Sequence, residues 1–177
     1  MPLSWIKQTR QLLQNLRSKD PAVKIALVGV GNVLMGDDAA GMLVVQRLKT
    51  CLPADSFIIP IEGGSAPENI TGLIRNMLPG LVVFIDAGDI ELAPGSQALF
   101  LSNEAEGVSA FGHSLPLSVL GQYLEKEVGC QSLMLIIQPE KIDFDIPVSS
   151  PVEQAVETIT AGWMNLAAEF PGQTAVP

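Results

Sequence analysis

Residues 24–48, KIALVGVGNVLMGDDAAGMLVVQRL, contain the pattern that decides the fold. They open with a short apolar run, residues 24–29, that ends in glycine, which is typical of a buried strand. A glycine-containing loop follows. Residues 37–48 then read as a helix with an acidic first turn and basic residues near its end, an order that suits the helix dipole. The stretch therefore predicts a strand, a turn and a helix in succession, the unit from which α/β proteins are built.

The same alternation continues along the chain. Further strands are predicted at residues 57–61, 81–86, 97–101 and 132–138, and further helices at residues 65–78, 116–128 and 151–170. Residues 87–96 are too few for a helical crossover, so the strand that follows them is expected to run antiparallel at or near an edge of the sheet. The predicted fold class is a three-layer α/β/α sandwich around a twisted, mostly parallel five-stranded sheet with one antiparallel strand.

Three parts of the chain are expected. Residues 3–18 read as an amphipathic helix that a following Asp-Pro pair ends, so residues 1–20 are predicted to form an N-terminal helical extension. Such a helix could pack on the domain or contact a partner. Residues 21–170 are predicted to form one domain with a sizeable core, and residues 171–177 a flexible tail.

Composition and charge narrow the class of protein. Hydrophobic residues make up 47% of the chain and charged residues 16%, which is typical of a globular core. The net charge of −9 makes nucleic acid and anionic membranes poor partners, because both repel an acidic surface. No apolar run predicts membrane insertion and no export signal is recognisable, so we expect a cytoplasmic protein. Cys51 and Cys130 are interpreted as unpaired thiols in a reducing compartment.

The glycine loop at residues 29–38, GVGNVLMGDD, departs from a dinucleotide site in two ways. Leu34 stands where the third glycine of a G-x-G-x-x-G motif should be. Asp37 and Asp38 begin the following helix, where they would repel the pyrophosphate that such folds bind. A small-ligand-binding α/β module is therefore only an alternative. Acidic residues in a first helical turn are also ordinary caps, so one aspartate is free to cap the helix while the other faces a site.

Three polar residues are predicted to meet at one edge of the sheet. Asp86 ends the apolar run LVVFID, and His113, the only histidine of the chain, precedes a predicted helix. A helix that leads into a parallel strand starts at the carboxyl edge. If the first and third strands are neighbours, Asp38 and Asp86 meet at that edge, where α/β proteins bind ligands, and His113 can complete the group. Two carboxylates and an imidazole suit a divalent ion such as nickel or zinc. Each residue alone also fits a plainer structural role.

The motifs around these residues resemble those of the hydrogenase maturation endopeptidases, most closely the branch that serves hydrogenase 3 type enzymes. The matching stretches are GVGNVLMGDDAAG (29–41), EGGSAPEN (62–69), FIDAGD (84–89), GHSLPL (112–117), IIQPE (136–140) and SPVEQAVET (150–158). They run in the family's order and together are highly specific. The N-terminal helix has no counterpart in the family pattern. Many members have glutamate at the position of Asp38, and this branch tends to have aspartate at that of Glu62.

The resemblance implies a peptidase that removes the C-terminal peptide from the nickel-loaded precursor of a nickel–iron hydrogenase large subunit. The family's metal-contacting residues map to Asp38, Asp86 and His113, which are also the candidate catalytic residues. The nickel is implied to arrive in the substrate, with no tightly held metal of the enzyme's own. Either nickel polarises the scissile carbonyl or activates a water, or an aspartate acts as general base while nickel positions the peptide. A non-cleaving chaperone of the same precursor is the alternative from another class.

Four further residues, Met35, Gly63, Gly64 and Ser65, are expected to shape the substrate cleft. Adjacent glycines let a peptide backbone approach closely, although they also suit a simple turn. We expect the protease to act as a monomer on this precursor, without nucleic acid and without membrane insertion.

Overall fold

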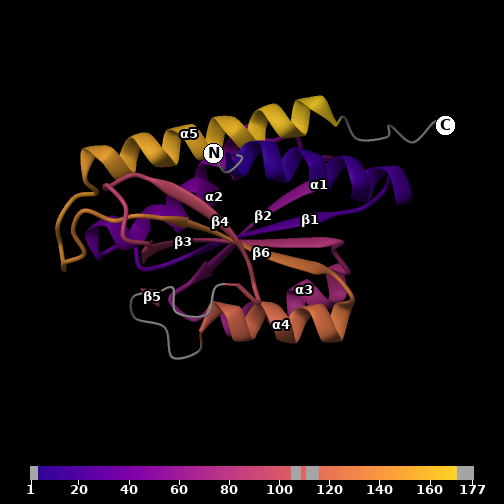
Figure 1. The fold of residues 1–177 in the computed structure, drawn as a ribbon, viewed down its shortest axis with the longest axis horizontal. Coiled ribbons are helices and arrows are strands. Elements are labelled where there is room, and N and C mark those ends of the chain that lie inside the picture. Colours follow the sequence, from indigo (N-terminus) through magenta and orange to yellow (C-terminus); the bar gives the residue numbers. More distant parts are fainter. Residues whose placement is uncertain (1–3, 105–108, 111–115, 171–177) are drawn as a thin grey trace.

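A twisted, mainly parallel sheet forms the centre of the computed structural model, which describes residues 4–104, 109–110 and 116–170 (Figure 1). Along the sheet the strands follow the order β2-β1-β3-β6-β4. Their bounds are Ile25–Val30 for β1, Ile58–Gly64 for β2, Leu81–Asp89 for β3, Gln97–Leu101 for β4 and Gln131–Ile137 for β6. β4 runs antiparallel to β6 at the edge, which confirms the predicted antiparallel strand. A two-residue strand that the sequence did not predict, β5 (Ser109–Ala110), pairs with the end of β3.

Helices cover both faces of the sheet and make the predicted three-layer sandwich (Figure 1). The first face carries α1 (Trp5–Lys19), α2 (Ala40–Cys51) and α5 (Ser150–Glu169), and the second carries α3 (Thr71–Met77) and α4 (Leu117–Val128). Side chains of β1 and β3 alternate between the two cores: Leu27 and Ile85 face the first, whereas Val28 and Phe84 face the second. Because both faces are covered, these strands read as unbroken apolar runs.

The helices after β1 and β2 begin later than the sequence predicts, because each follows a short 3-10 turn. The turns are η1 (Gly36–Ala39), before α2, and η2 (Pro67–Ile70), before α3. The other predicted elements are present within a few residues of their expected bounds, and β3 extends to Asp89. None of the helices in the described part of the chain is long and apolar enough to cross a membrane.

The N-terminal helix α1 packs on α5. Trp5 is 8% exposed and packs against Trp163, with 5.9 Å between the ring centroids. A Cβ on Gly162 would lie 2.7 Å from the Trp5 indole, so α5 leaves room for that ring only because it carries a glycine there. The predicted helix is thus present and packs on the domain. The division of the chain after residue 20 stays a prediction, and residues 171–177 lie outside the described residues.

The two cysteines are both free thiols, as predicted, and differ in accessibility. Cys51 is exposed at the end of α2, whereas Cys130 is buried, and burial raises the pKa of its thiol to about 11. We expect iodoacetamide at mildly alkaline pH to alkylate Cys51 and to leave Cys130 unmodified, because the reagent needs both access and a thiolate. Intact mass spectrometry should find one adduct on the native protein and a second after urea unfolding. Two adducts on the native protein would contradict this prediction.

Candidate active site

A backbone N–H of the loop after β1 donates a hydrogen bond to the Asp38 side chain and holds it in place. The N–H of Asn32 donates to Asp38 Oδ2 at 2.7 Å, and the Asn32 side chain accepts the N–H of Leu34 at 3.0 Å, which fixes the turn. Gly31 has a φ of 121°, and a Cβ on it would lie 1.8 Å from the carbonyl oxygen of Asp38, so only glycine fits. Asp38 is 6% exposed, so its carboxylate is oriented by the loop rather than fully solvated.

Gly41 packs closely against the backbone of β1 and β3, and this contact places the turn that carries Asp38 beside these two strands. A Cβ on Gly41, in the first turn of α2, would lie 1.9 Å from the carbonyl oxygen of Ile85 and 2.6 Å from that of Val30. The start of α2 therefore packs directly on the sheet backbone. Because Ile85 precedes Asp86, this contact brings the elements that carry Asp38 and Asp86 to the same edge.

Asp86 lies near the carboxyl end of β3 and is 0% exposed. Its Oδ1 accepts the N–H of Ala87 at 2.9 Å. β3 lies between β1 and β6, so the first and third strands are neighbours, as the predicted site requires. Strand alternation puts the Asp86 side chain on the same face as Val82 and Phe84, the face that α4 covers. Burying a carboxylate is costly, and Asp86 lies at the carboxyl edge, where α/β proteins bind ligands, so it stays a candidate site residue.

The third residue of the predicted group, His113, lies outside the described residues. The described residues that precede it most closely form β5, which pairs with the last two residues of β3. Within the described ranges, no three acidic, histidine or cysteine side chains are grouped so that they could hold a metal ion. The structure thus brings the elements of Asp38 and Asp86 to one edge, and the complete three-residue group stays a prediction.

Asp37 holds a distant loop rather than capping a helix. Its carboxylate is fully buried and accepts four hydrogen bonds: from the N–H of Glu140 at 2.8 Å, the N–H of Lys141 at 2.9 Å, and the N–H and hydroxyl of Ser149 at 2.7 and 2.9 Å. Neither η1 nor α2 has a side-chain cap, so the interpretation of an aspartate as the cap is wrong. Asp37 instead ties the segment between β6 and α5 to the loop beside Asp38.

Replacement of Asp37 by alanine is expected to lower the free energy of unfolding by about 3 kcal/mol or more, since each buried donor left without an acceptor costs roughly 1–3 kcal/mol. Urea denaturation followed by circular dichroism measures the change. Asp143→Ala is the matched control, because Asp143 is exposed in the same segment and its ion pair with Lys141 is long, at 3.7 Å. Equal unfolding midpoints for the two variants would contradict the anchoring role of Asp37.

Gly64, one of the residues predicted to shape the cleft, is hydrogen-bonded to the loop after β1. Its carbonyl accepts the N–H of Gly31 at 3.0 Å, and its φ of 62° favours glycine. Gly63 precedes it in β2, Ser65 is exposed, and Met35 is half-buried just before η1. These residues lie in or beside the loops of the candidate site, and their contact with substrate stays a prediction.

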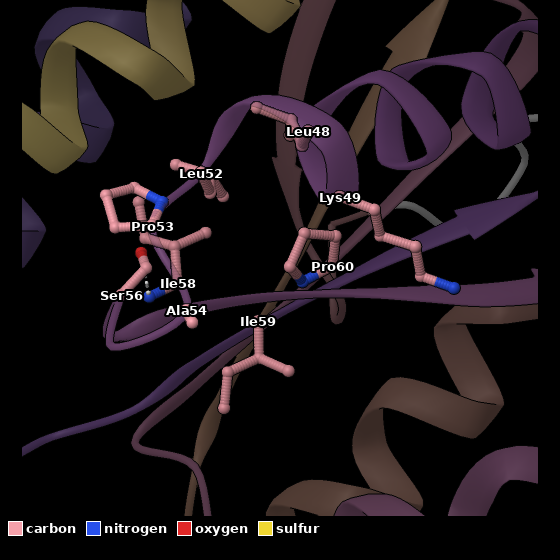
Figure 2. Close-up of a pocket in the computed structure, with 9 residues that line it drawn as sticks. All are labelled: Leu48, Lys49, Leu52, Pro53, Ala54, Ser56, Ile58, Ile59 and Pro60. Atoms are coloured by element: carbon pink, nitrogen blue, oxygen red, sulfur yellow. Dashed lines mark hydrogen bonds between the residues drawn. The ribbon is translucent and has the colours of Figure 1, made fainter.

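A cavity of about 200 Å³ lies at the amino-terminal half of β2, away from the carboxyl edge (Figure 2). Its walls come from the end of α2, the loop that follows and β2, and comprise Leu48, Lys49, Leu52, Pro53, Ala54, Ser56, Ile58, Ile59 and Pro60. Because Asp38 and Asp86 belong to the opposite edge of the parallel strands, this cavity is not the predicted catalytic site.

The fold is an α/β sandwich with two buried aspartates toward the carboxyl edge of its sheet, and similar proteins specify the class. The sequence profile of the HycI family, described as hydrogenase maturation protease, matches residues 42–165. The chain is 36% identical over 141 residues to the Hydrogenase 3 maturation protease of Escherichia coli (strain K12), which covers 77% of this chain and 88% of that protein.

Solved structures agree with this match. The fold is similar to that of a NiFe hydrogenase maturation protease HycI from Thermococcus kodakarensis KOD1, with a TM-score of 0.78 and 25% identity over 89% of this chain and 99% of that one. An endopeptidase HycI from Escherichia coli gives a TM-score of 0.69 and 32% identity over 80% of this chain and 92% of that one. The chain belongs to the hydrogenase maturation proteases. It is a peptidase that processes a hydrogenase precursor, which confirms the predicted family and enzyme class.

Proposed function

We propose that this peptidase removes the C-terminal peptide from the nickel-loaded precursor of a nickel–iron hydrogenase large subunit. Within a family of hydrogenase maturation proteases, the observation that carries the proposal is the buried Asp38 and Asp86, which belong to elements at the ends of two adjacent strands. Carboxylate oxygens and an imidazole suit a borderline divalent ion such as nickel. In this proposal nickel belongs to the substrate, and the protease recognises it.

His113 supplies the third group in this proposal. It follows β5 by three residues and precedes the start of α4 by four. β5 pairs with the carboxyl end of β3. α4 leads into β6, which is parallel to β3, so α4 begins at the carboxyl edge as well. The described elements on both sides of His113 support a position near Asp86.

Two assignments of catalytic roles to nickel and the aspartates fit this edge of the sheet. In the first, the substrate's nickel contacts Asp38, Asp86 and His113 and polarises the scissile carbonyl or activates a water. In the second, one of the aspartates takes a proton from the attacking water, while nickel only positions the peptide. In both, the water oxygen bonds to the carbonyl carbon, the C–N bond breaks, and a proton passes to the leaving amine.

The test is cleavage of nickel-loaded and nickel-free precursor by the full chain, followed by intact mass spectrometry. We expect loss of the tail mass from the nickel-loaded form alone, and no loss with a folded Asp38→Asn variant. Cleavage of both forms, or of neither, would overturn the metal-gated protease. Stable binding of the loaded precursor without cleavage would identify a chaperone instead.

We also propose that the protease acts as a monomer in the cytoplasm. Its two free thiols agree with a reducing compartment. Light scattering coupled to size-exclusion chromatography should give the mass of one chain, and a mass of two chains would contradict the monomer.

A further inference from the structure

We propose that the outer edge of β2 binds the precursor's tail as an added strand and leads it toward the carboxyl edge. The proposal rests on the proposed function. β2 ends the sheet path on this side, and no strand in the described ranges pairs with its outer edge. Such an edge offers backbone N–H and C=O groups to an extended peptide, and main-chain hydrogen bonds then supply affinity.

The ladder between β1 and β2 determines which backbone groups of β2 face outward. Ile25 is paired with Ile58, and the Ile25 N–H donates to the carbonyl of Phe57 at 2.9 Å. Along a parallel strand, the backbone N–H and C=O of successive residues point alternately to one neighbour and to the other side. Phe57 faces β1, so the N–H and C=O of Glu62, five residues later, point away from β1. Pro60 has the same orientation but lacks an N–H, so it offers only its carbonyl. The outward donor nearest the carboxyl end of this regular ladder is therefore the N–H of Glu62.

The carboxyl end of this edge is open and adjoins the loop that holds Asp38. A Cβ on Gly64 would meet no atom within 4 Å, so the space beside the end of β2 is open. The Gly64 carbonyl accepts the N–H of Gly31, and the next residue, Asn32, donates its N–H to Asp38. A strand added along β2 therefore has one end beside the residue that is hydrogen-bonded to the loop of the candidate site.

The Glu62 side chain does not cover the outer edge. Lys49 Nζ lies 2.6 Å from Glu62 Oε1, and Gln46 donates to Oε2 at 3.2 Å, so the carboxylate is held over α2. The hydrogen bond from Lys49 lowers the pKa of this carboxyl, which keeps it charged and turned toward the helix. The backbone of Glu62 therefore stays accessible although its side chain has partners.

The cavity in Figure 2 lies along the same strand and suits one apolar side chain of the tail. Leu52, Pro53 and Pro60 are among its walls. Its volume of about 200 Å³ is below the roughly 300–1,000 Å³ of small-molecule sites, so a single side chain fits better than a free ligand. Pro60 and Gly64 are separated by roughly 13 Å of strand at about 3.3 Å per residue, so about five residues of tail reach from the site to the cavity.

Two variants of Glu62 test the edge with nickel-loaded precursor. Both Glu62→Pro and Glu62→Ala lose the contacts with Lys49 and Gln46, but only Glu62→Pro loses the outward N–H. We expect the kcat/KM of Glu62→Pro to be about tenfold lower than that of Glu62→Ala, the effect of one backbone hydrogen bond. Equal values would overturn the added strand and leave the proposed function intact. Failure of the wild-type chain to cleave would overturn the proposed function itself.

A separate measurement decides the matter if a lower melting temperature shows that Glu62→Pro is less stable than Glu62→Ala. Amide exchange of Glu62 is then followed by NMR in the slowly cleaving Asp86→Asn chain, alone and with nickel-loaded precursor at a concentration at which light scattering shows the complex. We expect exchange at Glu62 to slow by about tenfold in the complex, and an unchanged rate would overturn the added strand.

The cavity is tested by Ala54→Phe, which should raise KM and leave kcat unchanged, because the phenyl ring fills the space for the tail's side chain. An unchanged KM would remove the cavity from the proposal.

Discussion

Replacement of Asp86 by asparagine is expected to lower the kcat/KM of precursor cleavage by about 100-fold or more, the usual scale for loss of a positioned acid or base. Asparagine has nearly the same shape, and its Oδ1 can still accept the N–H of Ala87. Only the charge that would contact nickel or accept a proton is lost. A time course of tail release from nickel-loaded precursor, read by intact mass, measures the effect. Asp38→Asn and His113→Ala are expected to have the same outcome.

The matched control for this variant is Asp89→Asn on the same strand. Asp89 is exposed, and its Oδ1 accepts the N–H of Glu91 at 3.0 Å, so it has a similar local bond without a position in the site. Its cleavage rate should stay near that of the wild type. Equal activity of Asp86→Asn and Asp89→Asn would remove Asp86 from the site, and equal loss in both would indicate general damage to β3.

Replacement of Gly41 by alanine is expected to reduce the free energy of unfolding by about 3 kcal/mol, the upper part of the usual range for overpacked cores. The new Cβ would lie 1.9 Å from the carbonyl oxygen of Ile85, which belongs to the sheet backbone and cannot turn aside as a flexible side chain could. The start of α2 must therefore move away from β3, and the turn that carries Asp38 moves with it. Urea denaturation measures the stability, and the cleavage assay measures the displacement.

Gly72→Ala provides a control of opposite sign. Gly72 lies in α3, and a Cβ on it would meet no atom within 4 Å. Alanine there should stabilise the protein by roughly 0.5–1 kcal/mol, since a helical glycine loses more chain entropy on folding. If both substitutions destabilised the protein equally, the close contact at Gly41 would not be the cause.

The strands and their order could be predicted because burial on both faces gives them a plain signature. LVVFID is apolar without alternation, as a central parallel strand must be, and the short link at residues 87–96 allowed only an antiparallel strand after it. The 3-10 turns η1 and η2 could not be distinguished from the first turns of helices, because both accept the same residues. β5 consists of two residues, which is too short for any periodic pattern.

The candidate site was predictable to the extent that it depends on topology. Asp38 and Asp86 follow from the positions of two strand ends, and the structure confirms that these strands are neighbours. The role of Asp37 was not predictable, because its partner Ser149 is 112 residues away and two of its other donors are backbone N–H groups, which any residue supplies. Adjacent aspartates of identical type thus have different roles, which only their tertiary contacts distinguish.

The fit of Trp5 over Gly162 has an evolutionary consequence. The helix that carries Trp5 lies outside the residues matched by the family profile, so some homologues are expected to lack it. Without the helix, the close contacts of Trp5 and Ile6 with a side chain at Gly162 are lost, and a larger residue there could cover the Trp163 ring, which the helix otherwise helps to bury. The two positions should therefore covary across homologues: glycine at the α5 position where the N-terminal tryptophan is present, and a bulkier side chain where the helix has been lost.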